Sequence, residues 1–265
     1  MNNTDFAKFY DKQPEYAAFR SDKHKREYYD VASDWKVREL VKLVPGNMFF
    51  NNVLEVGCAF GVLLNNISDR LNIKTRTGVD ISGENIKSAK KDWPECNFFH
   101  GTVEEFIRHI EPNIQDSRFD LIVLSDIVEH IPDDIGFMKT IRGISSYVLL
   151  NLPLEKSIST RKRIYDENDP SGHLHCYDKE LAINLINRAG FNILNSYSSI
   201  AFFDRQFYLA YRRNRKERIS RKPIHLKIFW DIFYFFQDRL KLASKTLYQR
   251  MYGINYFALL KSSDK

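Results

Sequence analysis

A mostly parallel β-sheet covered by helices on both faces is the fold class that this sequence predicts. Hydrophobic residues make up 43% of the 265 positions and charged residues 28%, which is enough apolar material for a real core. Through the middle of the chain, short β-type runs alternate with longer segments of helical character. Because repeated strand–helix–strand units place successive strands side by side in parallel, this alternation indicates an α/β protein.

The N-terminal residues, 1–45, are expected to form a helical cap. They are polar and rich in tyrosine, and the stretches 23–30 and 33–43 suit helices. Pro45-Gly46 then breaks the pattern.

Five β-type runs and four helical segments follow in alternation. The β-type runs are 53–57, 77–81, 97–100, 120–124 and 147–152, and the helical segments are 62–71, 82–92, 103–110 and 134–141. A further helix over 178–189 begins at a capping Asp178 and ends before Gly190. We expect the five strands to pair in parallel.

Two more β-type runs, 191–198 and 206–211, lie too close together for a helix between them. A parallel crossover needs a dozen or more residues, so this pair is expected to be an antiparallel hairpin at one edge. The prediction is a Rossmann-like, seven-stranded, mostly parallel sheet over residues 46–211. Residues 212–265 then form a helical extension.

The cysteines and the apolar stretches exclude several classes of protein. Cys58, Cys96 and Cys176 are an odd number without a Cys-x-x-Cys pair, which argues against a disulfide framework and a structural zinc site. The sequence shows no apolar leader, and no apolar stretch approaches the roughly 20 residues of a spanning helix. We expect a cytoplasmic protein.

The sharpest motif is a strand that runs directly into two glycines, Val53-Leu-Glu-Val-Gly57-Cys-Ala-Phe-Gly61. Glycine lets backbone approach a ligand closely, and the helix that follows offers free N–H groups. A dinucleotide-binding loop needs three glycines with the first two one residue apart, which disfavours a nicotinamide or flavin enzyme. Asp80, roughly 20 residues further on, is placed to accept the hydroxyls of a ribose. Without a ligand, these residues would form only a tight turn and a helix cap.

Four segments in this order resemble class I S-adenosylmethionine-dependent methyltransferases. They are residues 55–61, 78–82, 119–133 with Glu129-His130, and 172–177 followed by Ala189-Gly190-Phe191. The first segment departs from the family pattern at Ala59, where a glycine is usual. The likeness covers about residues 51–211, and its last segment resembles that of small-molecule and sugar methyltransferases.

The resemblance implies S-adenosylmethionine as the methyl donor and assigns residues to it. Glu55, Gly57, Cys58 and Gly61 would hold the methionine end, Asp80 the ribose, Ile81 the adenine ring, Thr102 or Glu104 the adenine amino group, and Asp126 and Ile127 the floor beside the sulfonium.

Three of the seven histidines, His130, His173 and His175, follow strand ends and are the candidate catalytic bases. On an extended segment, His173 and His175 would point the same way, towards one shared site. His130 could instead brace the turn that follows it. A further alternative is Mg²⁺ bound by Asp126, Glu129 and His130, as in some quinone-pathway relatives with Glu-His; no metal site is assigned on this basis.

The net charge of +6 is concentrated in residues 211–265, which hold 14 Lys/Arg and 4 Asp/Glu. Residues 212–222 are a basic run, and 224–252 are rich in aromatic residues. Such a segment suits an amphipathic helix on an anionic membrane surface, a packed element, a homo-oligomer contact or a wall of the acceptor pocket. Nucleic acid is the least favoured partner, because no RNA-binding module accompanies the segment.

We therefore predict transfer of a methyl group from S-adenosylmethionine to a small-molecule or glycan-type acceptor, by O-methylation. The acceptor class rests on the resemblance alone. An RNA N-methyltransferase and a non-catalytic protein that binds an adenosine ligand stay open as alternatives.

Overall fold

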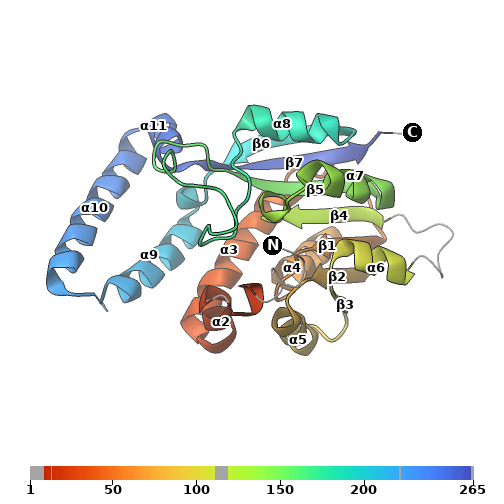
Figure 1. Cartoon of the computed structure of the whole chain (residues 1–265), viewed down its shortest axis with the longest axis horizontal. Coiled ribbons are helices and arrows are strands. Elements are labelled where there is room, and N and C mark those ends of the chain that lie inside the picture. The colour runs from red at the N-terminus through yellow and green to blue at the C-terminus, as the bar shows by residue number, and fades with distance from the viewer. Residues whose placement is uncertain (1–8, 13, 111–118, 221, 264–265) are drawn as a thin grey trace.

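The computed structural model describes residues 9–12, 14–110, 119–220 and 222–263 (Figure 1). Residues 1–8 of the expected N-terminal cap lie outside this description. The described strands are β1 (Asn52–Val56), β2 (Thr75–Asp80), β3 (Asn97–His100), β4 (Phe119–Ser125), β5 (Ser145–Leu154), β6 (Phe191–Ser199) and β7 (Ile254–Ser262). The described helices are α2 (Pro14–Ser21), α3 (Lys23–Val41), α4 (Val62–Leu71), α5 (Gly83–Asp92), α6 (Val103–Ile110), α7 (Asp134–Ile144), α8 (Lys179–Arg188), α9 (Arg205–Ser220), α10 (Ile224–Ala243) and α11 (Lys245–Tyr252), with short 3-10 turns η2 (Val128–His130) and η3 (Ala201–Phe203).

The seven strands form one sheet in the order β3-β2-β1-β4-β5-β7-β6. Strands β1 to β5 pair in parallel, and β7 runs antiparallel to both of its neighbours, β5 and β6. The predicted fold class, a mostly parallel Rossmann-like sheet with an antiparallel edge pair, is confirmed. Since β1 to β5 are parallel, their carboxyl ends meet at one edge of the sheet.

The strand predicted at 206–211 is wrong. These residues lie in α9, and the antiparallel partner of β6 is β7. The run has β-type aromatic residues, but Phe207 and Ala210 are both buried and stand three apart, as on one face of a helix. A series of helix-favouring Arg, Lys and Glu residues continues the same helix. The sheet therefore does not close at Tyr211, because residues 212–265 supply the strand between β5 and β6.

Helices cover both faces of the sheet (Figure 1). Alternate residues of β4 separate the two sides: Ile122 and Leu124 pack with α6, α7 and α8, whereas Leu121 and Val123 pack with α3, α4 and α9. Strands buried on both faces are expected to be continuously apolar, as this one is. The two cores hold the strand ends in fixed positions.

The N-terminal and C-terminal helices lie outside the alternation. The two helical stretches expected in residues 23–43 form one continuous helix, α3, which begins at Asp22 as its N-cap. Helices α9 and α10 extend away from the sheet at the left of Figure 1, and α11 leads back into β7. None of the described helices is both long enough and apolar enough to cross a membrane.

Candidate active site

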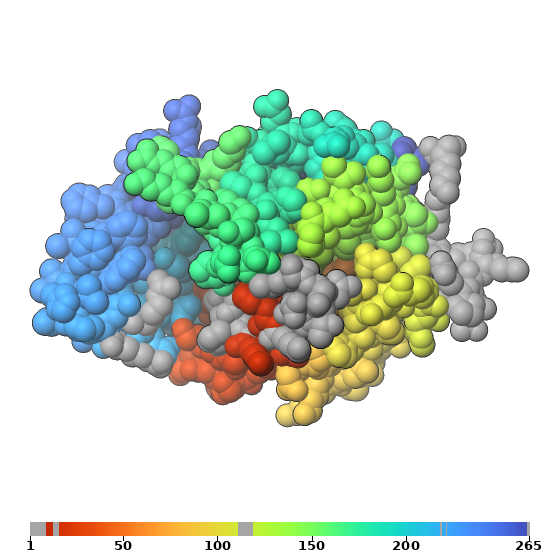
Figure 2. Space-filling model, viewed as in Figure 1, coloured from red at the N-terminus to blue at the C-terminus, as the bar shows by residue number. Residues whose placement is uncertain are grey.

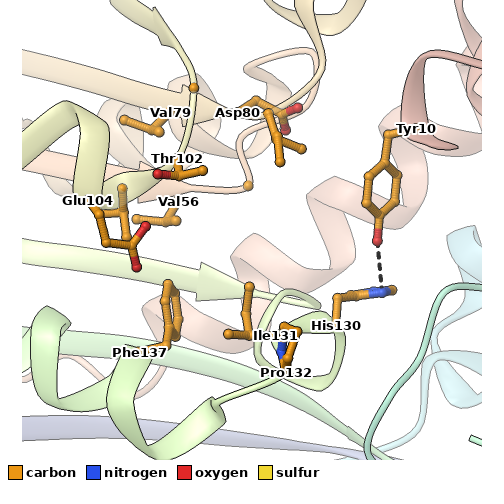
Figure 3. Close-up of a pocket in the computed structure, with 14 residues that line it drawn as sticks. Tyr10, Val56, Val79, Asp80, Thr102, Glu104, His130, Ile131, Pro132 and Phe137 are labelled. Atoms are coloured by element: carbon orange, nitrogen blue, oxygen red, sulfur yellow. Dashed lines mark hydrogen bonds between the residues drawn. The ribbon is translucent and has the colours of Figure 1, made fainter. Parts of the chain in front are cut away.

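A cavity opens at the edge where the parallel strands end (Figure 3). It holds about 690 Å³ of empty space, part of which is open to solvent. The lining residues are Tyr10, Val56, Gly57, Val79, Asp80, Ile81, Gly101, Thr102, Val103, Glu104, His130, Ile131, Pro132 and Phe137. Ligands of open α/β sheets bind outside the carboxyl ends of strands, so the position matches the fold.

The turn after β1 approaches the cavity with its backbone. Gly57 has φ +77° and Gly61 has φ +73°, conformations that favour glycine. A Cβ atom on Gly57 would stand 3.0 Å from Ile127 Cδ1, so Ile127 closes the space beneath the turn. Ala59, at the position where the family has glycine, also has a positive φ of 44°. The loop thus adopts the glycine conformation even at its one substituted position.

Asp80 ties the glycine loop to the start of α5. Its Oδ2 accepts the Ala59 N–H at 2.8 Å, and its Oδ1 accepts the Ser82 N–H at 2.8 Å. Burial raises the pKa of Asp80 above its ordinary value. Because each carboxylate oxygen has a second lone pair, the side chain can still accept hydrogen bonds from the hydroxyl groups of a ligand in the cavity.

Glu55 and Cys58 are buried and are absent from the described cavity lining. Burial raises the pKa of Glu55 and of the Cys58 thiol well above their ordinary values. Glu55 Oε2 has no hydrogen-bond partner among the described residues. The structure brings both residues to the glycine loop as predicted, and their contact with a cofactor stays a prediction.

Thr102 begins α6 as a capping residue. The Glu105 N–H donates to Thr102 Oγ1 at 3.2 Å, and the Thr102 N–H donates to Glu105 Oε2 at 2.8 Å, the reciprocal pattern of a capping box. Thr102 lines the cavity with Glu104, whose carboxylate is the nearby acid (Figure 3). The Thr102 hydroxyl oxygen already accepts the Glu105 N–H at the start of the helix. Of the two residues predicted for the adenine amino group, Glu104 is therefore the one whose side chain is not used in this cap.

Asp126 lies in a polar group just past β4 and, like Ile127, is not among the residues that line the described cavity. Lys36 Nζ is 2.5 Å from its Oδ2, and Asn151 Nδ2 donates to its Oδ1 at 3.1 Å. The residue has φ +52°, an uncommon conformation for aspartate. The following residue, Ile127, packs under Gly57. Both residues sit just past β4 as predicted.

His130 lines the cavity and is neutral. Its Nδ1 is 2.9 Å from the Gly172 carbonyl oxygen and 2.9 Å from Tyr10 Oη (Figure 3). A carbonyl oxygen can only accept, so the proton is on Nδ1 and Nε2 is left as an acceptor. Burial, with the neighbouring His173, lowers the pKa of His130 to about 4.

His173 packs edge-on against His130, with ring centroids 4.6 Å apart. Its Nδ1 is 2.7 Å from Glu155 Oε2, so the N–H donates to the carboxylate and Nε2 is left as the acceptor nitrogen. His173 lies beside His130 but is not among the residues that line the described cavity. Burial alone would raise the pKa of Glu155, but His173 and Arg163 outweigh it and hold that pKa below its ordinary value. The pair is a histidine oriented by a carboxylate, the arrangement that fixes the tautomer of a base.

An ion pair between the half-buried Arg163 and the buried Asp169 supports this histidine. Arg163 Nε and Nη2 donate to Asp169 at 2.6 Å each, and Arg163 Nη1 is 3.1 Å from both oxygens of Glu155. Asp169 also accepts the N–H groups of Ser171 and His173. The guanidinium thus joins the two carboxylates that hold the segment around His173.

His175 stays outside this group. Its Nε2 is 2.9 Å from the Ile131 carbonyl oxygen, to which it donates, and its Nδ1 is 3.9 Å from Asp134 Oδ2. The structure therefore brings His130 and His173 together but not the predicted pair His173 and His175. The backbone N–H groups of Leu174 and His175 both donate to the Glu129 carbonyl oxygen. The catalytic role of His175 stays a prediction.

Glu129 is buried beside the two histidines. Neither carboxylate oxygen has a hydrogen-bond partner among the described residues, and burial, with the charge of Asp126, raises its pKa well above the ordinary value. Candidate ligand atoms of Glu129, His130 and His173 lie within 4.8 Å of one another. One carboxylate with two imidazoles suits transition metals, whereas Mg²⁺ prefers oxygen ligands. In the structure Asp126 pairs with Lys36, so the third candidate ligand beside Glu129 and His130 is His173. A set of one carboxylate and two imidazoles does not fit Mg²⁺.

Several residues of the site escaped the sequence analysis. Lys36 and Tyr10 come from the N-terminal helical part, and their approach depends on tertiary packing that no local pattern shows. Glu155 follows β5 directly, so the strand-end reasoning that selected the histidines could have found it. Arg163 and Asp169 lie in the irregular segment between β5 and α8, where the sequence gives no periodicity.

Comparison with known proteins identifies the family. A model of the methyltransferase domain family matches residues 7–196. The chain belongs to this family. A ubiquinone biosynthesis O-methyltransferase of Actinobacillus pleuropneumoniae serotype 5b (strain L20) is 27% identical over 110 residues, which are 40% of this chain and 46% of that protein. The chain thus matches about half the length of this curated relative.

Solved structures show the same fold. The magnesium protoporphyrin IX methyltransferase of Synechocystis PCC 6803, with bound S-adenosylhomocysteine, has a TM-score of 0.57 at 12% identity and covers 98% of this chain and 99% of that one. An O-methyltransferase of a Brevibacillus brevis polyketide synthase, also with S-adenosylhomocysteine, has a TM-score of 0.55 at 16% identity, with 86% and 72% covered. The fold is that of class I S-adenosylmethionine-dependent methyltransferases.

The cavity fits S-adenosylmethionine. Gly57 lines the cavity with backbone alone, and Asp80 offers a carboxylate at the end of β2. Ile81 lines the same cavity beside it. When bound, the cofactor supplies an electrophilic methyl group. Asp80 and Ile81 would hold its adenosine part, and the glycine loop would hold its methionine part.

Proposed function

We propose that this chain transfers the methyl group of S-adenosylmethionine to an oxygen of a small-molecule or glycan-type acceptor, with His173 as the base. The observation that carries the proposal is the 2.7 Å contact between His173 Nδ1 and Glu155 Oε2. Glu155 fixes the tautomer, so Nε2 is the proton acceptor, and a hydroxyl acceptor needs such a base more than an amine does. The O-methyltransferase relative supports the choice of oxygen.

The remaining groups of the site position and desolvate the reactants. Tyr10 and His130 close one side of the cavity, and Phe137, Ile131 and Pro132 give it an apolar wall. Excluding water strengthens the electrostatic contacts inside and holds the acceptor in line with the methyl group. With its pKa lowered to about 4, His130 is a weak base, and we assign it to positioning.

A contact with a membrane surface or with a second copy through residues 212–265 stays a prediction of the sequence. The basic charge and exposed apolar residues of the segment support it.

His173→Asn tests the proposal. We expect turnover to fall by about 10²–10⁴-fold, the usual effect of removing a general base, with the melting-temperature shift by S-adenosylhomocysteine retained. Glu155→Gln should cost about 10–100-fold, because the histidine loses its orienting partner. Turnover is measured with radiolabelled S-adenosylmethionine against a panel of phenols, catechols and sugars.

His109→Asn is the matched control, because His109 is an exposed histidine on α6 and should leave turnover unchanged. A loss below tenfold for His173→Asn with any acceptor that is turned over contradicts the role of the base. Cofactor binding without turnover of any acceptor would favour the non-catalytic alternative, and salt-sensitive RNA binding would favour an RNA substrate.

A further inference from the structure

Helix α10 presents its apolar side to solvent. Seven large apolar residues on it are each more than half exposed: Ile224, Ile228, Phe229, Ile232, Phe235, Phe236 and Leu242. At 100° per residue most of them fall on one continuous face. Figure 1 shows α10 at the left margin of the molecule, and Figure 2 shows the same region, in blue, as its left flank. The apolar face is therefore not covered by the described part of the chain.

The opposite face of α10 holds polar and aromatic residues against the protein. Tyr234 is buried under Arg215 of α9, with the guanidinium carbon 4.1 Å from the ring centroid. Arg215 also lies 3.6 Å from Asp238, and Lys241 Nζ lies 3.5 Å from the Tyr208 ring centroid. Cation–π contacts and an ion pair thus fix the helix to α9. This arrangement inverts the usual amphipathic helix, whose apolar face points inward.

The surroundings of this face are strongly basic. Residues 211–265 hold 14 Lys/Arg and 4 Asp/Glu. Arg212, Arg213 and Lys216 on α9 and Arg239 on α10 are exposed. A symmetric dimer through α10 would bring two copies of the same positive segment together, which like-charge repulsion disfavours. An anionic bilayer complements both the apolar face and the charge.

We propose that α10 is a membrane-surface helix that docks the protein on anionic phospholipid. The apolar face enters the boundary between headgroups and acyl chains, and the basic residues of α9 and α10 contact lipid phosphates. The aromatic residues of the helix suit this boundary. Docking needs no acceptor and no methyl transfer, so it stands or falls separately from the proposed activity.

The full chain is sedimented with vesicles of phosphatidylglycerol and phosphatidylcholine, and with vesicles of phosphatidylcholine alone. We expect binding to the anionic vesicles at least about tenfold tighter, weakening as NaCl rises from about 0.05 to about 0.5 M. The triple variant Ile228→Ser/Ile232→Ser/Phe236→Ser should bind at least about tenfold more weakly, because three apolar side chains no longer enter the bilayer.

The matched control is Phe49→Ser/Ile164→Ser/Leu194→Ser, three exposed apolar residues outside α10. It should bind vesicles as the wild type does. The melting-temperature shift by S-adenosylhomocysteine verifies that each variant is folded. The proposal is overturned if the wild-type chain does not bind anionic vesicles, or if the control variant loses as much binding as the α10 variant. A wild-type dimer that the α10 variant converts to monomer, without vesicle binding, would show that a second copy covers the face.

Discussion

Asp169→Asn should destabilise the segment that carries His173. Asp169 is 3% exposed and accepts two hydrogen bonds from Arg163 and the N–H groups of Ser171 and His173. Burial opposes ionisation, but these donors, with Arg163 foremost, hold the pKa of Asp169 at about 2. A carboxyl whose pKa falls from 3.8 to about 2 on folding contributes about 2 kcal/mol at neutral pH.

The sign of this contribution fixes its pH dependence. A lowered carboxyl pKa stabilises the fold fully above pH 3.8 and loses its effect as the pH falls through about 2. The difference between wild type and Asp169→Asn should therefore be constant from about pH 5 to 8 and shrink in stronger acid.

Urea unfolding and trypsin cleavage at the exposed Arg161 and Lys162 measure the effect of Asp169→Asn. Since about 2 kcal/mol corresponds to roughly 30-fold, a segment that opens locally should be cut about 30-fold faster in the variant. Asp166→Asn, an exposed aspartate of the same segment, is the control and should change neither readout. If Asp169→Asn and Asp166→Asn behave alike in both assays, the ion pair does not organise the segment.

Two further predictions concern the glycine loop and the sheet. Gly57→Ala should abolish the melting-temperature shift by S-adenosylhomocysteine and cost about 1–2 kcal/mol of stability, because its Cβ at φ +77° would stand 3.0 Å from Ile127 Cδ1. Gly46→Ala is the control, because Gly46 has open space around it. An unchanged shift in Gly57→Ala would refute the role of the glycine loop in binding the cofactor. Truncation after Tyr211 should yield insoluble or unfolded protein by circular dichroism, because it removes Ile254–Ser262 from between β5 and β6; a folded truncated chain that still binds S-adenosylhomocysteine would refute this.

The parallel part of the fold was predictable because its signals are local. The apolar runs of β1 and β4 are buried, and the helices α4 and α6 have the predicted bounds. The antiparallel strand was not predictable in the same way. β7 lies far from β6 in sequence, and its register with β5 depends on contacts that only the folded chain supplies.

The candidate site likewise has residues that the sequence locates and contacts that only the folded chain shows. Gly57, Asp80 and His130 follow strand ends, and the rule for open α/β sheets locates them. The pairing of His173 with Glu155 depends on how the irregular segment between β5 and α8 folds over the edge. His173 and His175 were expected to share one site, but their imidazole rings have different partners, Glu155 for His173 and the Ile131 carbonyl oxygen for His175.

The position of β7 has a consequence for the order of synthesis. Ser199 of β6 and Asn255 of β7 are paired in the sheet, yet residues 200–254 separate them in the chain. During translation, β5 and β6 therefore emerge well before the strand that joins them. Until then the edge of β5 is open, and open edges recruit foreign strands. Closing this long loop also costs more entropy than closing a tight hairpin, so β5 keeps an unpaired edge longer than a strand with a hairpin partner would.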